Sequence, residues 1–434
     1  MKRVFLFVSV FCIGSLFSQN TKDHPAELVS LYLSQSEFVS HELFVPLQNK
    51  SGHDLPEELN TYEVFNIDFE ALESLRSNSP DGFQLPIQFS EQVFDLNLIQ
   101  VDLFSDDFVV KEEPNGIKHK IDLGLHYRGI VQGFEGSIVA ISIFENEVNG
   151  MFSIPGRTGN MVLGKIEDSP SHILYNDNDI KDEFDFVCET APFDSEEIFN
   201  PSSLKSQTVK CPEIFIDVGN DIHNGKGGVT YATNYVTAVF NQVAVLYAND
   251  NINIVLSGIN VWSNPEPFGG LDAYRTYRQS NSVPGDLNAY VNYAYGGGVA
   301  WLEGMCSSFK YSVSGINSSY NNVPTYSWSI EVLAHELGHN MGSPHTHACA
   351  WNLNNTAIDG CGPEAGYSEG CDASLPPSGG TVMSYCHLTS VGINFSNGFG
   401  TQPAARIASF IDNSSCVAIC APPSSCNDGV QNGE

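Results

Sequence analysis

Apolar and polar residues alternate along much of the first 180 residues of the chain. The stretches VFDLNLIQVDLF (93–104) and GSIVAISIFENEVNGMFSI (136–154) show the two-residue period of half-buried strands. Glycines and Asn-Gly pairs separate such stretches, as turns between strands require. We therefore expect residues 20 to about 180 to form a β-rich domain.

A different pattern begins in the second half of the chain. Residues 213–219 and 252–262 have the composition of strands, whereas residues 230–247 carry apolar side chains at helical spacing. Residues 287–295 are a further helix candidate. The glycine-rich run from Gly296 is predicted to be a strand that another backbone can approach closely. Strands that alternate with helices indicate an α/β domain.

Two further segments follow neither pattern. Residues 1–19 place Lys2 and Arg3 before an apolar run that is too short to span a bilayer, as a secretory signal peptide does. Residues 189–212 are polar and contain proline, which is typical of a linker. No other stretch approaches about 18 consecutive apolar residues, so we expect a secreted, soluble protein without a membrane span.

The charge balance argues against one class of partner. The chain has 51 acidic and 19 basic residues and a formal net charge of -32, so its surface repels phosphate backbones and nucleic-acid binding is not expected. Acidic residues keep exported proteins soluble, and some of these carboxylates are candidate calcium ligands. Ten cysteines follow the signal peptide, and an oxidising compartment would allow them to form disulfides.

Residues 335–345, HELGHNMGSPH, contain the strongest chemical signal. His335 and His339 are four residues apart, so on a helix they share one face and can bind one ion. Gly342 can adopt the left-handed conformation that ends the helix, which lets His345 return to the same ion. Three neutral imidazoles with one open position are typical of a catalytic zinc site. The expected helix has Ser327 or Ser329 as its cap, Glu331 in its first turn and an apolar stripe of Ile330, Leu333, Ala334, Leu337 and Met341.

Glu336 supplies the second half of this chemistry. It directly follows a ligand, so its carboxylate lies beside the ion and can take a proton from a metal-activated water. It can then pass that proton to the leaving amine of a cleaved peptide bond. By average residue usage, HExxH arises by chance in roughly one chain in a hundred of this length, and the full pattern in about one in a hundred thousand.

The pattern HExxHxxGxxH resembles that of the metzincin metallopeptidases. In these enzymes a methionine turn lies beneath the zinc histidines, and Met383 in GGTVMSYCH stands at that position. The order of elements is similar to that of adamalysin-type (reprolysin-like) domains of exported bacterial proteins, which implies a mixed twisted sheet, an active-site helix and bound Zn²⁺. The resulting assignment is signal peptide 1–19, β-rich propeptide 20–205, zinc metallopeptidase domain 206–420 and a truncated cysteine-rich repeat 421–434.

Two residues depart from the adamalysin pattern. Thr346 stands where these enzymes place a structural aspartate, which affects the subfamily more than the chemistry. Tyr385 lies two residues after the turn methionine, as in astacins and serralysins, where such a tyrosine reaches the zinc or the oxyanion. Here it either does so or is a buried tyrosine bonded elsewhere. The residues after the turn, 387–395, are expected to line the pocket beside the metal, and for His347 and His387 we expect exposed or structural roles.

The resemblance also assigns substrate and calcium contacts. GGGVAW (296–301) resembles the edge strand that pairs with an extended substrate. Its candidate substrate contacts are Gly297, Gly298, Val299 and Ala300. Glu213 and Asp286 match two family positions for Ca²⁺, although Ile419 stands where the family has a further asparagine ligand.

Eight cysteines between 211 and 420 can form four bridges, and sequence alone does not fix their pairing. The resemblance favours Cys306–Cys416 and Cys349–Cys386, and Cys361–Cys371 and Cys211–Cys420 are further candidates. Cys188 is left over. In adamalysins a propeptide cysteine often keeps the enzyme latent by filling the open zinc position, so Cys188 is a candidate latency ligand. A bridge from Cys188 to Cys211 or Cys426 is the alternative.

The sequence therefore predicts a secreted zinc endopeptidase that is made as a latent zymogen. We expect a monomer that cleaves proteins or peptides and is inhibited by its own propeptide. One alternative is a catalytically silent binding or adhesion module with the same fold, against which the complete ligand set and Glu336 argue. The other is a processing peptidase of narrow specificity.

Overall fold

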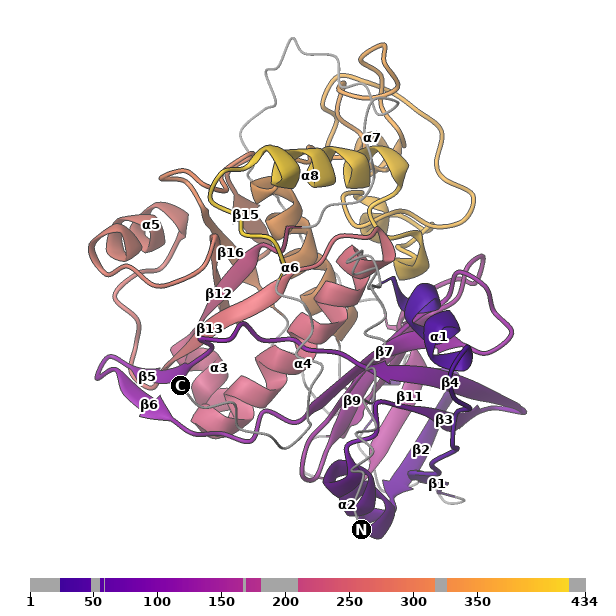
Figure 1. The fold of residues 1–434 in the computed structure, drawn as a ribbon. Coiled ribbons are helices and arrows are strands. Elements are labelled where there is room, and N and C mark those ends of the chain that lie inside the picture. The colour runs from indigo at the N-terminus through magenta and orange to yellow at the C-terminus, as the bar shows by residue number, and fades with distance from the viewer. Residues whose placement is uncertain are drawn as a thin grey trace, which may run out of the picture.

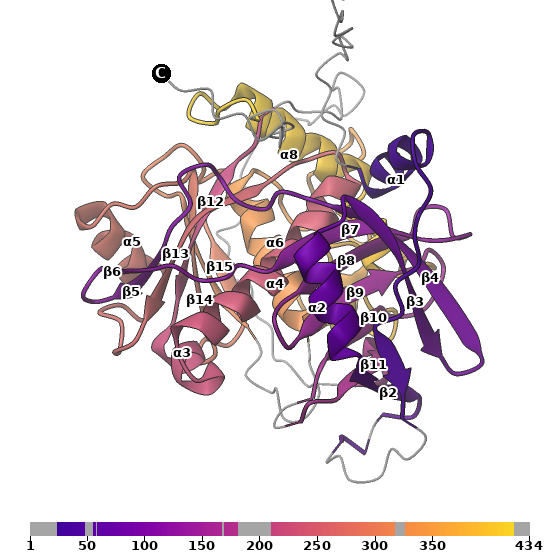
Figure 2. The same ribbon diagram turned by 60° about the horizontal axis from the view of Figure 1, so that its bottom comes forward.

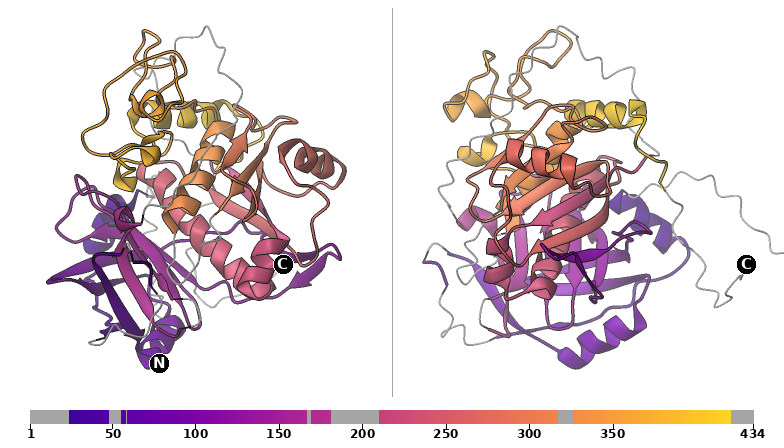
Figure 3. Two further views of the ribbon diagram at one scale, coloured as in Figure 1. Left: turned by 180° about the vertical axis from the view of Figure 1, so that it is seen from behind. Right: turned by 90° about the vertical axis from the view of Figure 1, so that its left-hand side faces the viewer.

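The structure, a computed structural model, describes residues 24–47, 55–57, 59–166, 169–180, 210–316 and 326–420 (Figure 1). The expected signal peptide, Cys188, most of the linker and the C-terminal repeat lie outside the described residues. The molecule contains two large sheets, and the long helix α4 (Val229–Asn249) lies between them (Figures 1 and 3). In the part of the chain that is described, no helix has the length and apolar character needed to cross a membrane.

Residues 24–180, here called the N-terminal module, form a nine-stranded antiparallel sheet, so the β-rich prediction for this region is confirmed. Its strand order is β1-β2-β11-β10-β9-β8-β7-β4-β3, in which most neighbours are successive hairpin strands. The elements of this sheet and its helices are α1 (Pro25–Leu33), β1 (Phe44–Pro46), β2 (Tyr62–Ile67), α2 (Phe69–Asn78), β3 (Gly82–Phe89), β4 (Gln92–Gln100), β7 (Leu125–Val131), β8 (Ile138–Ile143), β9 (Val148–Ser153), β10 (Met161–Lys165), β11 (His172–Asn176) and the short η1 (Asp177–Asp179).

Both faces of this sheet are covered. All residues of β8 and β9 are buried, so the prediction of half-buried strands is wrong for this pair. Val139 and Ile141 belong to a core that includes Leu72 and Leu75 of α2. Their neighbour Ala140 faces the other way, into a core shared with α4. Continuous apolar runs of this kind occur when a sheet packs against other elements on both sides.

The second sheet has seven strands in the order β15-β16-β14-β12-β13-β5-β6. Its central pairs are parallel, and the two outermost pairs are antiparallel, so the mixed sheet that we expected is present. Its strands are β5 (Val110–Glu113), β6 (Ile117–His119), β12 (Glu213–Val218), β13 (Val255–Trp262), β14 (Leu287–Asn292), β15 (Gly298–Ala300) and β16 (Tyr311–Gly315). The remaining helices are α3 (Asn220–Lys226), α5 (Leu271–Ser280), α6 (Tyr326–Asn340), α7 (Cys361–Glu364), α8 (Thr401–Asn413) and the short η3 (Cys386–Leu388) and η4 (Phe395–Asn397).

Two strands of this sheet come from the N-terminal module. β5 pairs in parallel with β13, and β6 then pairs with β5 at the edge (Figure 2). The sheet that residues 206–420 build thus continues into residues 110–119. The division between module and peptidase domain therefore runs between neighbouring strands of one sheet.

Residues 287–295 do not form the helix that we considered. They contain β14, which lies between β12 and β16 and is buried throughout. A run of six residues is too short for its apolar spacing to separate a buried strand from a helix, and here parallel partners on both sides decide the conformation. The long helix predicted over residues 230–247 is confirmed as α4.

Candidate metal centre and active site

Helix α6 carries the first part of the motif. It begins at Tyr326, so Ser327 and Ser329 lie inside the helix and the prediction that one of them caps it is wrong. The helix ends at Asn340, and Gly342 follows with φ +95°, the left-handed conformation that turns the chain. The predicted apolar stripe is fully buried and consists of Ile330, Leu333, Ala334, Leu337 and Met341.

The turn at Gly342 brings the three motif histidines together. Nε2 of His339 lies 3.0 Å from Nε2 of His335 and 3.2 Å from Nε2 of His345. The Nδ1 atom of His335 donates to the carbonyl of Val382 at 2.8 Å, and that of His339 donates to the carbonyl of Ser343 at 2.7 Å. A carbonyl only accepts, so these neutral rings carry their proton on Nδ1 and present Nε2 lone pairs to one another.

Burial keeps these histidines uncharged. Desolvation lowers the pKa of His335 and of His339 well below the ordinary value, and the neighbouring imidazoles add to the effect. Burial also lowers the pKa of His345, but a hydrogen bond to Glu369 opposes it. Three converging lone pairs in a buried site repel one another unless a cation lies between them. The donor set of three neutral imidazoles fits Zn²⁺. One ring nitrogen from each histidine lies within 4.8 Å of the other two, so all three can bind a single ion.

Glu369 is a functional candidate that the sequence did not reveal. Its Oε1 atom accepts a hydrogen bond from Nδ1 of His345 at 2.5 Å and lies 3.3 Å from Nε2 of His347. Partial burial raises the pKa of Glu369, but the hydrogen bonds to the two histidines outweigh it and hold that pKa below its ordinary range. A carboxylate behind a ligand histidine fixes the ring and strengthens it as a donor. Nothing in the spacing of Glu369 from the motif distinguished it from the other acidic residues of the chain.

The methionine turn lies directly against the helix. Met383 is fully buried, and a Cβ atom on Gly338 would lie only 2.7 Å from its sulfur. The glycine inside HELGH thus makes room for the methionine. Thr346 joins the two parts, because its backbone N–H and its hydroxyl both donate to the Met383 carbonyl, at 3.0 and 3.3 Å. A threonine therefore ties the third ligand to the turn where the adamalysin pattern has an aspartate.

Glu336 lies against the predicted substrate strand. It is fully buried, and a Cβ atom on Gly298 of β15 would lie 2.2 Å from its Oε1. β15 is at the edge of the seven-stranded sheet and pairs antiparallel with β16. The structure thus brings Glu336 and the expected substrate strand together, with Gly298 at the point of contact. The same strand contains Val299 and Ala300, and Gly297 directly precedes it.

Tyr385, His347 and His387 surround the ligand set. The Tyr385 ring is buried and its centroid lies 4.8 Å from that of His345. His347 is buried and stacks on His345 at 4.9 Å. Nδ1 of His387 lies 2.8 Å from Oε1 of Glu331. The first turn of α6 contains no acidic residue, so the prediction that Glu331 lies there is wrong. The structural role that we expected for His347 and His387 agrees with these contacts.

The disulfides differ in part from the pairing that the resemblance favoured. Cys306–Cys416 and Cys211–Cys420 are present. The other two bonds join Cys349 to Cys371 and Cys361 to Cys386, so Cys349–Cys386 and Cys361–Cys371 are wrong. The latter four cysteines lie within 38 positions of one another, in a segment of loops and very short helices where spacing does not reveal which pairs meet.

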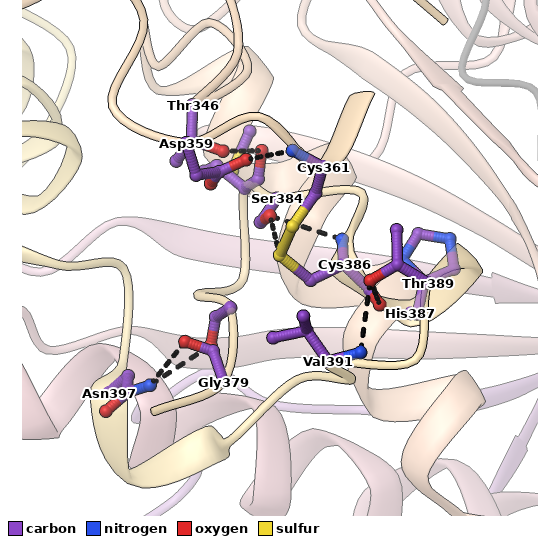
Figure 4. Close-up of a disulfide and its surroundings, with 12 residues drawn as sticks. Thr346, Asp359, Cys361, Gly379, Ser384, Cys386, His387, Thr389, Val391 and Asn397 are labelled. Carbon is purple, nitrogen blue, oxygen red and sulfur yellow. Dashed lines mark hydrogen bonds between the residues drawn. A yellow bond between two sulfur atoms is a disulfide. The ribbon is translucent and has the colours of Figure 1, made fainter. Parts of the chain in front are cut away.

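Each of these two bonds supports the centre. Cys361–Cys386 ties α7 to the chain just after the methionine turn, where Ser384 donates a hydrogen bond to the Cys386 sulfur at 2.9 Å (Figure 4). Cys349–Cys371 ties the segment after His345 to the loop that carries Glu369. The second bond therefore helps to keep the carboxylate beside the third ligand.

The predicted calcium ligands lie together at the start of β12. The backbone N–H of Glu213 donates to the Asp286 carboxylate at 3.0 Å, and burial raises the pKa of both carboxyl groups. The Lys310 ammonium lies close by and donates to the Gly285 carbonyl at 2.6 Å. Calcium binding at Glu213 and Asp286 stays a prediction.

Comparison with known proteins points to the same chemistry. Residues 214–396 match the sequence model Reprolysin_5, metallo-peptidase family M12. A zinc metalloproteinase-disintegrin-like protein of Cerberus rynchops is 26% identical over 252 residues, which are 51% of this chain and 39% of that protein. The snake venom metalloproteinase-disintegrin-like mocarhagin of Naja mossambica is 23% identical, over 55% of this chain and 44% of its own.

A third relative aligns over more of the chain. The zinc metalloproteinase-disintegrin-like BmMP of Bungarus multicinctus is 24% identical over 333 residues, 70% of this chain and 52% of its own. The chain thus spans about half the length, or less, of these relatives. The segment that matches the family model, residues 214–396, contains the three histidines, Glu336 and Met383. Together with the mixed α/β fold and the disulfides, these matches support a metzincin-family peptidase.

Proposed function

We propose that the protein is a secreted zinc-dependent endopeptidase that is made as a latent zymogen. The observation that carries this proposal is the convergence of three imidazole Nε2 atoms beside a buried glutamate and an edge strand. The family match supports the chemistry, because metallopeptidase family M12 implies zinc and protein substrates.

The residues have distinct tasks in this reaction. The three histidines would hold Zn²⁺ through Nε2, and the ion would supply polarisation of a substrate carbonyl and a water whose pKa is lowered to about 7. β15 aligns an extended substrate by backbone pairing, which brings the scissile bond to Glu336. The Glu336 carboxylate accepts the proton of the attacking water and delivers it to the leaving nitrogen. The Tyr385 side chain, packed on His345, is the candidate donor to the oxyanion.

Secretion and latency are the finer parts of the proposal. The N-terminal sequence has the pattern of a signal peptide, and four disulfides suit an oxidising compartment. One relative, mocarhagin, is a snake venom metalloproteinase-disintegrin-like protein, which is consistent with an extracellular enzyme. Latency would depend on the segment between the module and β12, where Cys188 is the candidate zinc ligand.

The test compares wild type with Glu336→Gln, each as the full chain with a cleavable sequence inserted within residues 189–209. After the linker is cut, wild type is expected to degrade casein and to lose this activity when zinc is chelated. The variant should contain the same amount of zinc by elemental analysis and degrade no casein. Equal inactivity of both proteins with zinc bound would favour the silent binding module for ordinary protein substrates. Cleavage of single peptides without casein degradation would favour narrow specificity.

A further inference from the structure

The N-terminal module completes the sheet of the peptidase domain. The backbone N–H of Ile259 in β13 donates to the Val109 carbonyl at 3.0 Å, and that of Ser263 donates to the Glu113 carbonyl at 3.0 Å. Leu256 and Leu103 are joined in the same way at 2.9 Å. Without the module, β13 would be a long apolar edge strand with unpaired backbone groups. Such edges promote aggregation, and stable proteins cover them.

The module also covers one face of helix α4. Asn241 is fully buried and donates to the Ile141 carbonyl at 3.2 Å, and its Oδ1 accepts from Nε of buried Arg128 at 3.0 Å. Ala238, Val245 and Ala248 share this face by helical spacing and are fully buried. Removal of the module would expose this face and leave the Arg128–Asn241 contact broken. The apolar core that runs from β8 through α4 to the peptidase sheet is continuous.

A third contact reaches the segment after the methionine turn. Asn160 of the module donates to the Ile393 carbonyl at 3.2 Å and accepts from the Phe395 backbone N–H at 2.9 Å. Ser153 donates to Oδ1 of Asn394 at 2.9 Å and accepts from the Ser396 N–H at 3.0 Å.

The segment after the methionine turn also donates hydrogen bonds to the N-terminal module. The Asn394 amide donates to the carbonyls of Ile154 and Arg157, at 3.1 and 2.9 Å. Asn394 is 1% exposed, so its side chain is buried within this contact. Residues 393–395 belong to the stretch that the sequence predicts to line the substrate pocket. The module therefore holds the backbone of this stretch through buried side chains.

We infer that the N-terminal module stays bound to the peptidase domain after the linker is cut, as a permanent subunit that shapes the pocket. Activation would thus require cleavage within residues 181–209 but no release of the module. This inference rests on the proposed function, because it specifies how the latent form is activated and what its substrate pocket contains. All four disulfides of the described residues lie within the peptidase domain, so the sheet, the core and the buried polar contacts would hold the fragments together.

The first experiment uses the full chain with a cleavable sequence inserted within residues 189–209. After complete cleavage, verified on a denaturing gel under reducing conditions, the sample is passed over a size-exclusion column at micromolar and at nanomolar concentration. Co-elution of both fragments at both concentrations, with and without reductant, is the expected result. Elution of the module apart from a peptidase fragment that remains folded by circular dichroism would overturn the inference.

The second experiment tests the contact with the pocket. Ser153→Ala removes a hydroxyl that bonds Asn394 and Ser396, whereas Ser137→Ala removes an equally buried hydroxyl that bonds Val131 and Phe134 within the module. In the cut protein, Ser153→Ala is expected to raise KM several-fold and to alter the cleavage preference, with zinc content unchanged. Ser137→Ala should leave both at the wild-type level. Identical KM and preference for the two variants would overturn the role in shaping the pocket.

The two proposals fail in different ways. Co-elution of the fragments without any zinc-dependent hydrolysis would leave the association intact and contradict the peptidase. Separation of the fragments with full hydrolytic activity in the peptidase fragment would leave the peptidase intact and contradict the association.

Discussion

His345 and Glu369 form a close hydrogen bond, with Nδ1 of the histidine 2.5 Å from Oε1 of the glutamate. The other two motif histidines donate to backbone carbonyls. The third ligand is therefore the one with an anionic partner, and a loop that Cys349–Cys371 closes supplies it. The negative charge makes Nε2 of His345 a better donor to a cation.

Removal of this partner should weaken zinc binding. Glu369→Ala takes away both charge and hydrogen bond, and we expect an increase of about 10- to 100-fold in the zinc dissociation constant. Glu369→Gln can keep an acceptor oxygen and should fall between wild type and the alanine variant. Competition with a chromogenic zinc chelator measures the constants directly, independently of activity.

Glu364→Gln is the matched control, because Glu364 is an exposed acid in the neighbouring helix α7. It should bind zinc as tightly as wild type. If Glu369→Ala did the same, the hydrogen bond would have no part in holding the metal ligand.

Gly298 should be essential for activity but not for zinc. A methyl group there would lie 2.2 Å from the Glu336 carboxylate, so Gly298→Ala must displace the general base or the strand. We expect kcat/KM to fall by about 100-fold or more, as misplacement of a catalytic group does. A Cβ atom on Gly296 meets nothing within 4 Å, so Gly296→Ala is the control and should retain activity. Equal activity of the two variants in a fluorogenic peptide assay would contradict this contact.

Tyr385→Phe removes the hydroxyl of Tyr385 and keeps its ring, so it tests the contribution of the hydroxyl alone. The phenyl ring can keep the packing against His345, at 4.8 Å between centroids, so zinc content should not change. If the hydroxyl stabilises the oxyanion, kcat should fall by about 100-fold while KM changes little. Steady-state kinetics of the cut wild-type and variant proteins measure kcat and KM and distinguish the two roles. An unchanged kcat would assign Tyr385 a packing role alone.

Asp250 should make the folded state less stable as pH rises. Burial raises its pKa to about 7, even though the Phe399 N–H donates to its carboxylate at 2.7 Å. Between about pH 4 and pH 7 the folded protein keeps this proton and the unfolded chain does not, so the free energy of unfolding decreases with rising pH. Asp250→Asn should be more stable than wild type near neutrality and lose the advantage near pH 4. Urea unfolding of both proteins across this range measures the difference. A stability difference that does not vary with pH would contradict the raised pKa.

The local sequence predicted the elements that carry a strong period. The apolar spacing of α4 and the motif on α6 survive in the structure because burial of one apolar stripe is enough to specify a helix. The three histidines meet because a helix fixes His335 and His339 and one left-handed glycine brings the chain back. These features depend on residues that are near one another in sequence.

What could not be predicted depends on distant partners. β14 resembles a helix locally and becomes a strand because β12 and β16 flank it. Glu369 reaches His345 through a fold of irregular chain that two disulfides close, and its spacing has no period. The pairing of β5 with β13 joins segments nearly 150 positions apart, which no local pattern encodes.

The pairing of β5 with β13 has a consequence for synthesis of the protein. Residues 110–113 leave the ribosome long before their partner strand at 255–262. Until α4 and that strand are synthesised, one apolar face of the first sheet therefore stays exposed to solvent. Contacts of such large sequence separation slow folding and lengthen the period in which the chain can aggregate. A gene fragment that begins at residue 206 would have the complementary problem, because it encodes a sheet whose last strands are never made.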